Sequence, residues 1–386
     1  MRLCIISHTE HYLDDKGEIV GHASTVTEIN HLLDVFSSIV HLAMLYPNAA
    51  PSNTSRYLSS KIEFIPIPTA GGSKLKDKLR HFSNLPKTLS VIDSQLKDAD
   101  YFQFRAPTGI GVYVIPYLII FKSDTKGWYK YAGNWKQNNA PLSYKFQKWL
   151  LKLQTKHVTI NGQWDRQAKH CLSFQNPCLS KQELERGRTV RRGKTINDGF
   201  ELCYVGRLEA EKGLDLLITA LYSLPKAVKQ QISKMHFIGT GELLEQYEQR
   251  CKALDINFEF YGVLPRENVH GLFERCQCIL LPSKSEGFPK VITEAMNYGC
   301  IPLVSNVSAI GQYIIHDSNG YLIEPLSANT LKGLLTDFLL LNEAAYRGLM
   351  AQEAFFKRFS YAQYNQRIIK EVLGLSPSIY NISHKN

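Results

Sequence analysis

Short, continuous apolar segments that alternate with helical stretches constrain the fold of this chain most strongly. In the first half, the apolar segments cover residues 3–7, 38–42, 62–66 and 101–104, and helical patterns cover 24–36 and 85–97. In the second half, the apolar segments cover residues 202–206, 235–239, 258–262, 278–282 and 301–305. Strands that are apolar along their whole length belong to sheets covered on both faces, and alternation with helices produces parallel βαβ units. The sequence therefore predicts an α/β protein with two doubly wound parallel sheets.

The composition changes between these two series of strands. Residues 176–199 begin with an Asn-Pro pair, contain a charged stretch and show weak periodicity, which is typical of a linker. We therefore expect an N-terminal domain over residues 1–175, a linker over 176–199 and a C-terminal domain over 200–358. A last helical pattern, residues 361–373, predicts that the segment 359–386 forms a helix that packs back toward the N-terminal domain, followed by a tail.

The charge and composition of the chain limit the class of protein. Its 386 residues include 45 Lys and Arg against 35 Asp and Glu, a formal charge of +10 that favours anionic partners. The longest apolar run, residues 109–121, is much shorter than the roughly 20 residues that span a bilayer. The opening apolar block is too short for a secretory signal, and the 8 cysteines lack the paired spacing of a zinc module. We therefore expect a cytoplasmic protein rather than an integral membrane protein, a disulfide-stapled domain or a zinc module.

One segment, residues 283–296, combines the features of an anion-binding site. It follows an apolar strand and is expected to open a helix, with Pro289 in the first turn and Ser283 or Ser285 as the cap. The N-terminus of a helix presents unpaired amides and partial positive charge, which favour a diphosphate. Gly287 lets the backbone approach a ligand closely.

Two carboxylates, Glu286 and Glu294, belong to this segment. Their separation in the sequence corresponds to about 12 Å along a helix axis. This distance matches the span from a sugar ring, across a diphosphate, to a ribose, so one carboxylate would bind sugar hydroxyls and the other ribose hydroxyls. The alternative is that Glu286 compensates the helix dipole and Glu294 lies on a solvent-exposed face.

Two cations, Arg207 and Lys212, flank the loop that follows the first strand of the second half. A planar guanidinium and a compact ammonium in this position can clamp a diphosphate and stabilise the charge that develops on it as a leaving group. The alternative is that Lys212 pairs with Glu209 or Glu211 on a solvated loop.

The segment around Glu286 and Glu294 closely resembles the nucleotide-sugar motif of the GT-B-fold retaining glycosyltransferases of family 4, also grouped as glycosyl transferases group 1. Further segments stand in the order of this family: residues 204–213, 237–241, 260–265 and 319–322. The resemblance implies two doubly wound, Rossmann-like domains that face each other across a cleft. The donor-binding residues that it implies are Gly21, Gly206, Arg207, Lys212, Gly239, Gly241, Gly262, Val263, Glu286, Gly287, Phe288, Pro289, Lys290, Val291 and Glu294.

The N-terminal half carries two candidate positions. Residues 7–21 are expected to form a loop, and in the family a glycine-containing loop here, with Gly21 in this chain, lies against the donor phosphate and the acceptor. The alternative for Gly21 is an ordinary turn glycine. Residues 101–107 fall where many family members carry a histidine that faces the sugar, and this chain has Gln103 and Arg105 instead. Arg105 is the candidate for this place, and the alternative is a structural arginine at a strand end.

The segment 141–156 has the pattern of a basic, aromatic and amphipathic helix. Such a helix can lie on an anionic membrane. The alternative is a core helix whose apolar face is buried in the domain, because a strand pattern follows it at residues 158–161. The basic run 186–194 either binds polyanions or solvates the linker.

The resemblance implies a hexosyltransferase that moves a sugar from a nucleoside-diphosphate sugar to an acceptor hydroxyl with retention of configuration, without a cofactor or an essential metal. The catalytic residues that it implies are Arg207, Lys212 and Glu286, and Arg105 is the candidate catalytic residue at the place where this chain departs from the family's histidine. The expected acceptor is a glycan or a lipid-linked molecule of cell-envelope polysaccharide or glycolipid synthesis, and peripheral contact with an anionic membrane would place the protein at the inner face of the cytoplasmic membrane. The alternatives are a catalytically silent nucleotide-sugar-binding protein and a basic nucleic-acid-binding protein, although no nucleic-acid-binding module is recognisable.

Overall fold

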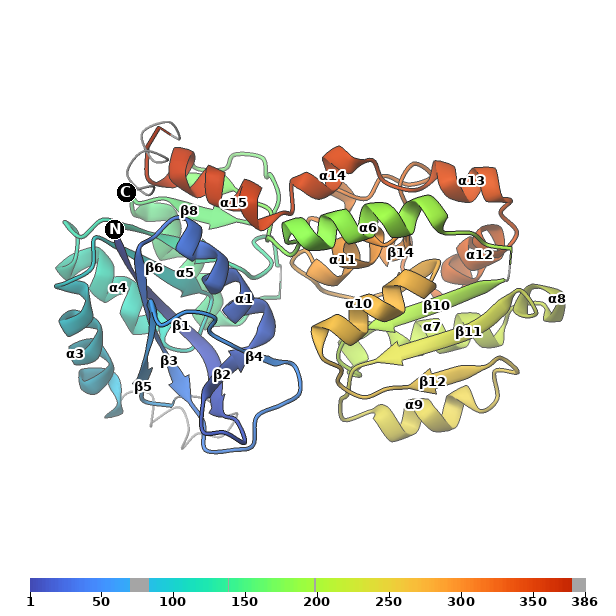
Figure 1. Ribbon diagram of the computed structural model, residues 1–386, viewed down its shortest axis with the longest axis horizontal. Helices are drawn as coiled ribbons and strands as arrows, with labels where there is room; N and C mark the ends of the chain where they lie inside the picture. Colours follow the sequence, from blue (N-terminus) through green and yellow to red (C-terminus); the bar gives the residue numbers. More distant parts are fainter. Residues whose placement is uncertain (70–82, 138, 198, 377–386) are drawn as a thin grey trace. The chain divides into compact units, whose positions relative to one another are not determined.

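The computed structural model describes residues 1–69, 83–137, 139–197 and 199–376 (Figure 1). The chain divides into two compact units, each of which is described by itself. Unit 1 comprises Met1–Asn176 together with Tyr361–Asn386, and unit 2 comprises Pro177–Ser360.

Among the described residues, unit 1 is built on a nine-stranded sheet. Seven of these strands run parallel in the spatial order β5-β3-β1-β6-β7-β8-β9. Their bounds are β1 (Arg2–Leu13), β3 (Ser38–Leu45), β5 (Ile62–Ile67), β6 (Tyr101–Ala106), β7 (Gly127–Tyr131), β8 (Val158–Ile160) and β9 (Cys171–Ser173). Two short strands, β2 (Ile19–His22) and β4 (Thr54–Arg56), extend the far end of β1 with antiparallel pairing.

Helices cover both faces of this sheet because alternate residues of β1 point to opposite sides. Cys4 and Ile6 pack in a core with the helices α3 (Leu85–Leu96), α4 (Gly111–Phe121) and α5 (Leu142–Leu153). Leu3 and Ile5 pack in a second core with α1 (Ala23–His31) and α15 (Tyr361–Arg367), which lie side by side in Figure 1. The last helical segment of the chain therefore completes unit 1, where Asn365 Nδ2 donates to the carbonyl of His31 at 2.6 Å.

Unit 2 has a six-stranded sheet, wholly parallel, in the order β12-β11-β10-β13-β14-β15 within the described part of the chain. One face packs against α10 (Arg266–Arg275) and α11 (Lys290–Asn297), and the other against α12 (Ala328–Leu339), which contacts α7 (Leu214–Tyr222). The strands are β10 (Phe200–Val205), β11 (Ile232–Ile238), β12 (Phe258–Phe260), β13 (Cys278–Leu281), β14 (Ile301–Ser305) and β15 (Tyr321–Ile323). The predicted fold class, an α/β protein with two doubly wound sheets, is confirmed.

Residues 176–199 differ from the expected linker, because most of them form helix α6 (Lys181–Gly193) within unit 2. A capping box begins this helix: Ser180 Oγ accepts from the Glu183 amide at 3.2 Å, and a Glu183 oxygen accepts from the Ser180 amide at 2.7 Å. The side chain of Asn297 on α11 donates to the Glu183 carbonyl at 2.8 Å. The sequence has little apolar periodicity here since α6 is mainly polar, so its start is specified by the cap and not by an apolar face.

Residues 7–21 also differ from the expected loop, because they form a β-hairpin. Strand β1 continues to Leu13, the chain turns at Asp14, and β2 returns with Gly21 opposite His11. Asp14 Oδ1 accepts from the amides of Lys16 and Glu18 at 2.9 and 3.0 Å and so closes the turn. A Cβ on Gly21 would lie 2.4 Å from the His11 ring, so this glycine makes room for a buried imidazole. Gly21 is thus neither in a loop nor in a turn.

Replacement of Ser180 by Ala removes the cap of α6. We expect Ser180→Ala to lower the free energy of unfolding of unit 2 by about 1 kcal/mol, measured by chemical denaturation of the whole protein. Thr189→Ala in the interior of the same helix is the control and should leave stability unchanged or slightly higher, because Ala favours helix interiors. Equal unfolding midpoints for Ser180→Ala and the wild type would contradict the assigned start of α6.

Candidate functional site

An ion pair between Lys212 and Glu286 joins two loops at the carboxyl edge of the unit 2 sheet. Lys212 follows β10, and Glu286 follows the neighbouring strand β13. The ammonium of Lys212 donates to Glu286 Oε1 at 2.6 Å, and both side chains are largely buried. The sequence alternative in which Lys212 pairs with Glu209 or Glu211 is therefore wrong. A cation and a carboxylate meet where ligands of doubly wound sheets bind.

The backbone brings these two loops together. Gly213 has φ +75°, and a Cβ there would lie 1.9 Å from the carbonyl oxygen of Pro282. The amide of Lys284 donates to the carbonyl of Glu211 at 2.8 Å. Any side chain at position 213 would push the loops apart, so glycine is required for the approach of Lys212 to Glu286.

Glycines also allow the loops after β10, β11 and β12 to pack against one another. Gly239 has φ +132°, and a Cβ there would lie 2.0 Å from the Gly206 carbonyl oxygen. The amide of Gly239 donates to the carbonyl of Gly262 at 2.8 Å, and Val263 follows in the same loop. A Cβ on Gly241 would lie 2.4 Å from the Leu208 carbonyl oxygen. These predicted donor-binding glycines thus shape the backbone of the carboxyl edge.

Arg207 lies on the surface of the same loop. Its side chain is 71 % exposed and pairs with Glu209 at 2.8 Å. The Tyr204 hydroxyl donates to the Arg207 carbonyl at 2.8 Å and fixes the backbone. The backbone of Arg207 is therefore anchored, whereas its guanidinium makes an exposed ion pair, which contributes little to stability.

The segment between Glu286 and Glu294 is helical only in its second half. Helix α11 begins at Lys290 with Pro289 as its N-cap residue, and among the described residues no side chain, including those of Ser283 and Ser285, caps it. The length of about 12 Å expected for a continuous helix therefore does not apply, because residues 286–289 are not helical. Gly287 lies in this loop, and Lys290 and Val291 form the first turn.

Phe288 anchors the loop that leads into α11. Its ring is buried and lies 4.7 Å from the ring of Tyr313 and 5.2 Å from the ring of Phe359, measured between centroids. The side chain of Phe288 thus belongs to the core of unit 2, and only its backbone remains to contact a ligand.

Glu294 is buried on α11 and pairs with Arg266, the first residue of α10. The alternative in which Glu294 lies on a solvent-exposed face is therefore wrong. Arg266 also bonds Glu183 Oε1 at 3.0 Å and the carbonyl of Cys178. Burial would raise the pKa of Glu183, but the charges of Arg266 and His270 and the Ser180 amide hold it below its usual value.

Arg266 was not among the predicted site residues. The signal was present, because Arg266 directly follows the segment 260–265 that resembles the base-side loop of the family. A carboxylate as buried as that of Glu294 needs a cation or several donors, which the sequence alone does not identify.

In unit 1, Arg105 belongs to a buried ion cluster. Its Nε donates to Gln103 Oε1 at 2.9 Å, and its guanidinium pairs with Glu28 of α1. Lys130 of β7 pairs with the same oxygen of Glu28, and its ammonium lies 4.9 Å from the ring centroid of Tyr364. Glu28 and Lys130 belong to no recognisable sequence motif. They form an ion pair because α1 packs over β6 and β7, and the sequence alone does not show this packing.

A chain of hydrogen bonds lies close to this cluster. His41 joins Ser7 Oγ at 2.7 Å and the Tyr57 hydroxyl at 2.6 Å, and the same hydroxyl lies 2.8 Å from His11 Nε2. Burial lowers the pKa of His11 to about 4, and burial together with the charges of His11 and Arg105 lowers that of His41 well below its usual value. Both imidazoles are therefore neutral at pH 7 and add no positive charge beside Arg105.

One group of three possible metal ligands lies elsewhere in unit 2. Glu201, His236 and Cys276 bring their ligand atoms within 4.8 Å of one another. Glu201 is at the amino end of β10, whereas Lys212 follows its carboxyl end. Glu201 Oε2 already lies 2.8 Å from His236 Nε2 and 3.4 Å from Arg275 Nε. This group is thus engaged in internal pairing and is separate from the pair formed by Lys212.

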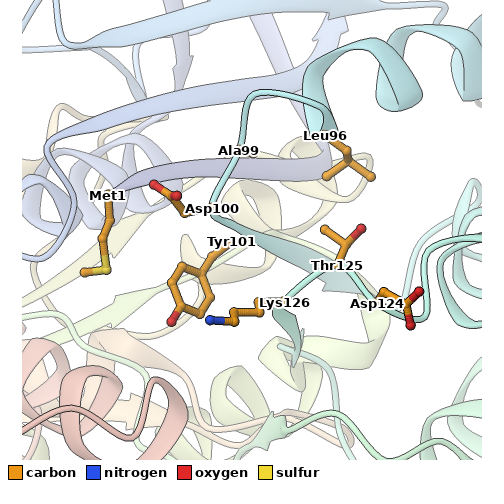
Figure 2. A pocket seen from close by; sticks show the side chains of 8 residues that line it. All are labelled: Met1, Leu96, Ala99, Asp100, Tyr101, Asp124, Thr125 and Lys126. Carbon is orange, nitrogen blue, oxygen red and sulfur yellow. The ribbon is translucent and has the colours of Figure 1, made fainter.

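Figure 2 shows a pocket of about 580 Å³ in unit 1. The ammonium of Lys126 lies beside the ring of Tyr101, 6.0 Å from its centroid. The pocket lies at the amino ends of β1, β6 and β7, whereas Arg105 is near the carboxyl end of β6. It is therefore at the wrong edge for the ligand of a doubly wound sheet. Its lining residues are Met1, Leu96, Ala99, Asp100, Tyr101, Asp124, Thr125 and Lys126.

Replacement of Arg266 by Ala leaves the buried carboxylate of Glu294 without its cation. We expect Arg266→Ala to lower the free energy of unfolding by about 2–4 kcal/mol, since an unpaired buried charge is costly, measured by chemical denaturation. Arg250→Ala, which breaks the more exposed pair with Asp215, is the control and should cost less than about 1 kcal/mol. Equal losses in the two variants would contradict the central place of Arg266 in the site.

Part of the chain is similar to known glycosyltransferases. Residues 188–351 match the model of the family described as Glycosyl transferases group 1. An uncharacterised glycosyltransferase of Haemophilus influenzae is 36 % identical over 146 residues, 37 % of this chain and 40 % of that protein. An α-1,4-N-acetyl-D-galactosaminyltransferase of Campylobacter jejuni, named for an undecaprenol-diphosphate-linked acceptor, is 24 % identical over 160 residues, 42 % of each chain. The chain thus spans about two fifths of the length of these relatives.

Solved structures extend the likeness over both units. The Anabaena protein HepE, in a crystal structure with UDP and glucose, superposes with a TM-score of 0.70 over 97 % of this chain and 100 % of that chain, at 16 % identity. A lipopolysaccharide outer core galactosyltransferase, WaaB, gives a TM-score of 0.63 over 97 % of this chain and 99 % of its own, also at 16 % identity. The chain therefore has the GT-B fold of these glycosyltransferases, and the segment that matches the Glycosyl transferases group 1 model lies within its second unit.

Proposed function

We propose that this protein is a glycosyltransferase that moves a sugar from a nucleoside-diphosphate sugar to an acceptor hydroxyl with retention of configuration. The observation that carries the proposal is the pair of Lys212 and Glu286 at the carboxyl edge of unit 2, in which Glu286 belongs to the loop that leads to the N-terminus of α11. A cation, a helix N-terminus and the buried carboxylate of Glu294 on the same helix are the groups that a diphosphate between two sugar rings requires.

The diphosphate of the donor would replace Glu286 as the ionic partner of Lys212. Lys212 Nζ would turn from Glu286 to a phosphate oxygen, while the amides at the start of α11 meet the other oxygens. This exchange frees the Glu286 carboxylate to accept hydrogen bonds from hydroxyls of the sugar. Arg207, whose ion pair with Glu209 is exposed, would join Lys212 in stabilising the negative charge of the departing diphosphate.

Glu294 would hold the ribose. Arg266 pairs with its carboxylate and orients it, so the remaining lone pairs of Glu294 have a fixed direction before the nucleotide binds. Two ribose hydroxyls are suitable donors for one carboxylate. The positive charges of Lys212, Arg207 and the helix N-terminus would compensate the negative charge of the diphosphate, so the reaction would need no essential metal ion.

The acceptor would bind unit 1. Arg105 is the candidate for contact with the acceptor or with the transferred sugar, and its bonds to Glu28 and Gln103 would fix its direction. The Campylobacter relative is named for a lipid-linked acceptor, and crystal structures of HepE contain UDP or UDP-glucose. We therefore propose a lipid-linked glycan of cell-envelope synthesis as the acceptor class and UDP-sugars as the first donors to test.

The first test is nucleotide binding. We expect one of UDP, GDP and ADP, with its sugar conjugates, to raise the melting temperature of the protein, because ligand binding stabilises only the folded state. Donor hydrolysis with the same panel then tests turnover. A protein that melts unchanged with every member of the panel would contradict the proposed site, and binding without any hydrolysis or transfer would indicate a silent nucleotide-sugar-binding protein.

The two carboxylates should separate binding from turnover. We expect Glu294→Gln to weaken the preferred nucleotide about tenfold, equivalent to about 1.4 kcal/mol, measured by titration calorimetry. Glu286→Gln should reduce kcat by about 100-fold or more with a smaller change in nucleotide affinity, because its bonds to the sugar act mainly in the transition state.

Glu245→Gln on the exposed surface of α9 (Leu244–Cys251) is the matched control for both carboxylate variants and should change neither quantity. Identical binding and turnover in Glu286→Gln, Glu294→Gln and the wild type would show that the donor site is elsewhere.

A further inference from the structure

Helix α5 exposes a stripe of large apolar side chains. Leu142, Phe146, Trp149 and Leu153 are 83 %, 39 %, 55 % and 64 % exposed. They follow one another at intervals of four, three and four residues, so at about 100° per residue all four fall within an arc of about 60°. The exposed stripe is therefore a continuous apolar face of the helix, which is unusual for a helix of a globular domain.

The opposite face of α5 holds the helix on unit 1. Gln147 and Leu151 are its fully buried residues. Gln147 accepts from the Thr108 amide at 3.1 Å and donates to the Thr108 carbonyl at 2.8 Å, and Leu151 belongs to the core beneath α4 and α5. The helix is thus attached through a narrow inner face. The sequence leaves open the alternative that the apolar face of this helix is buried in the domain. That alternative is wrong for the four side chains of the stripe, which are exposed.

Lysines line one flank of the stripe. Lys145, Lys148 and Lys152 recur at intervals of three and four residues, and α5 contains no acidic residue. Burial, followed by the charges of Lys152 and Lys136, lowers the pKa of Lys148, as expected where ammonium groups crowd one another. The outer surface of α5 therefore combines an apolar stripe with a row of positive charge.

The end of α4 extends this surface. Lys156 Nζ, just beyond α5, donates to the carbonyl of Ser123, just beyond α4, at 2.5 Å. The carboxyl ends of the two helices are therefore adjacent, and Ile120 and Phe121 near the end of α4 are 66 % and 71 % exposed. Six large apolar side chains thus face outward from one pair of helices.

We propose that the outer surface of α5, with the end of α4, docks this protein on an anionic lipid bilayer. The apolar stripe enters the boundary between headgroups and acyl chains, and the lysine flank lies on the negative headgroups. A protein partner fits this surface less well, because the cores of protein interfaces are depleted in lysine. In the part of the chain that the structure describes, no helix is long and apolar enough to cross a membrane, so the contact is peripheral. The inference concerns unit 1 alone and does not depend on the donor site of unit 2.

The test is co-sedimentation of the full-length protein with vesicles. We expect binding to phosphatidylglycerol-containing vesicles, weakening as salt concentration rises, and much weaker binding to pure phosphatidylcholine vesicles. The double variants Phe146→Ser/Trp149→Ser and Lys145→Glu/Lys152→Glu should each reduce binding to anionic vesicles by roughly tenfold or more.

Control variants carry matched changes on exposed residues of unit 2. Leu340→Ser and Lys226→Glu should bind vesicles like the wild type. All variants should keep the wild-type melting temperature and its nucleotide response, which separates the loss of docking from misfolding and from any failure of the donor site.

Two results would overturn the docking proposal. One is wild-type protein that stays in the supernatant with anionic vesicles, or stripe variants that sediment as the wild type does. The other is a protein that self-associates in solution through this surface, with Phe146→Ser/Trp149→Ser abolishing the association and leaving vesicle binding unchanged. The second result would assign the stripe to a contact between two copies of the chain.

Discussion

The ion pair between Lys212 and Glu286 is the interaction on which the proposed donor site depends. It joins the loops that follow two neighbouring parallel strands, β10 and β13, and it forms only because Gly213 admits the carbonyl of Pro282 at close range. Partly buried pairs of this kind contribute modestly to stability, since desolvation offsets much of their attraction. In a binding site such a pair has another role. It holds both side chains in place, and each of them can exchange its partner for a charged group of the ligand.

Much of the architecture was predictable because it rests on local pattern. Strands such as Leu202–Val205 within β10 are apolar throughout, and this alone indicates a sheet covered on both faces. Helix α6 was not predicted, because the sequence marks its start by a capping box at Ser180 and Glu183 and shows no apolar face along it. The hairpin at Asp14 was not predicted because its inner residue His11 is polar, so the sequence shows no apolar strand pattern there. The His11 ring is buried because the residue opposite it on β2 is Gly21, which has no side chain.

The candidate site shows the same division. Lys212, Glu286 and Glu294 lie in segments whose order and spacing indicate them. Arg266, Glu28 and Lys130 do not, because their importance comes from burial beside a charge that the chain brings from far away in the sequence. Arg105 was selected from its place on a strand, but its buried bond to Glu28 depends on how α1 covers the sheet, which no local pattern specifies.

A crystal structure of the protein with the nucleoside diphosphate that stabilises it would test the central claim most directly. We expect phosphate oxygens within hydrogen-bonding distance of Lys212 Nζ and of the first amides of α11, ribose hydroxyls hydrogen-bonded to Glu294, and Glu286 released from Lys212. A diphosphate bound elsewhere on the chain, with Lys212 and Glu286 still paired, would contradict it.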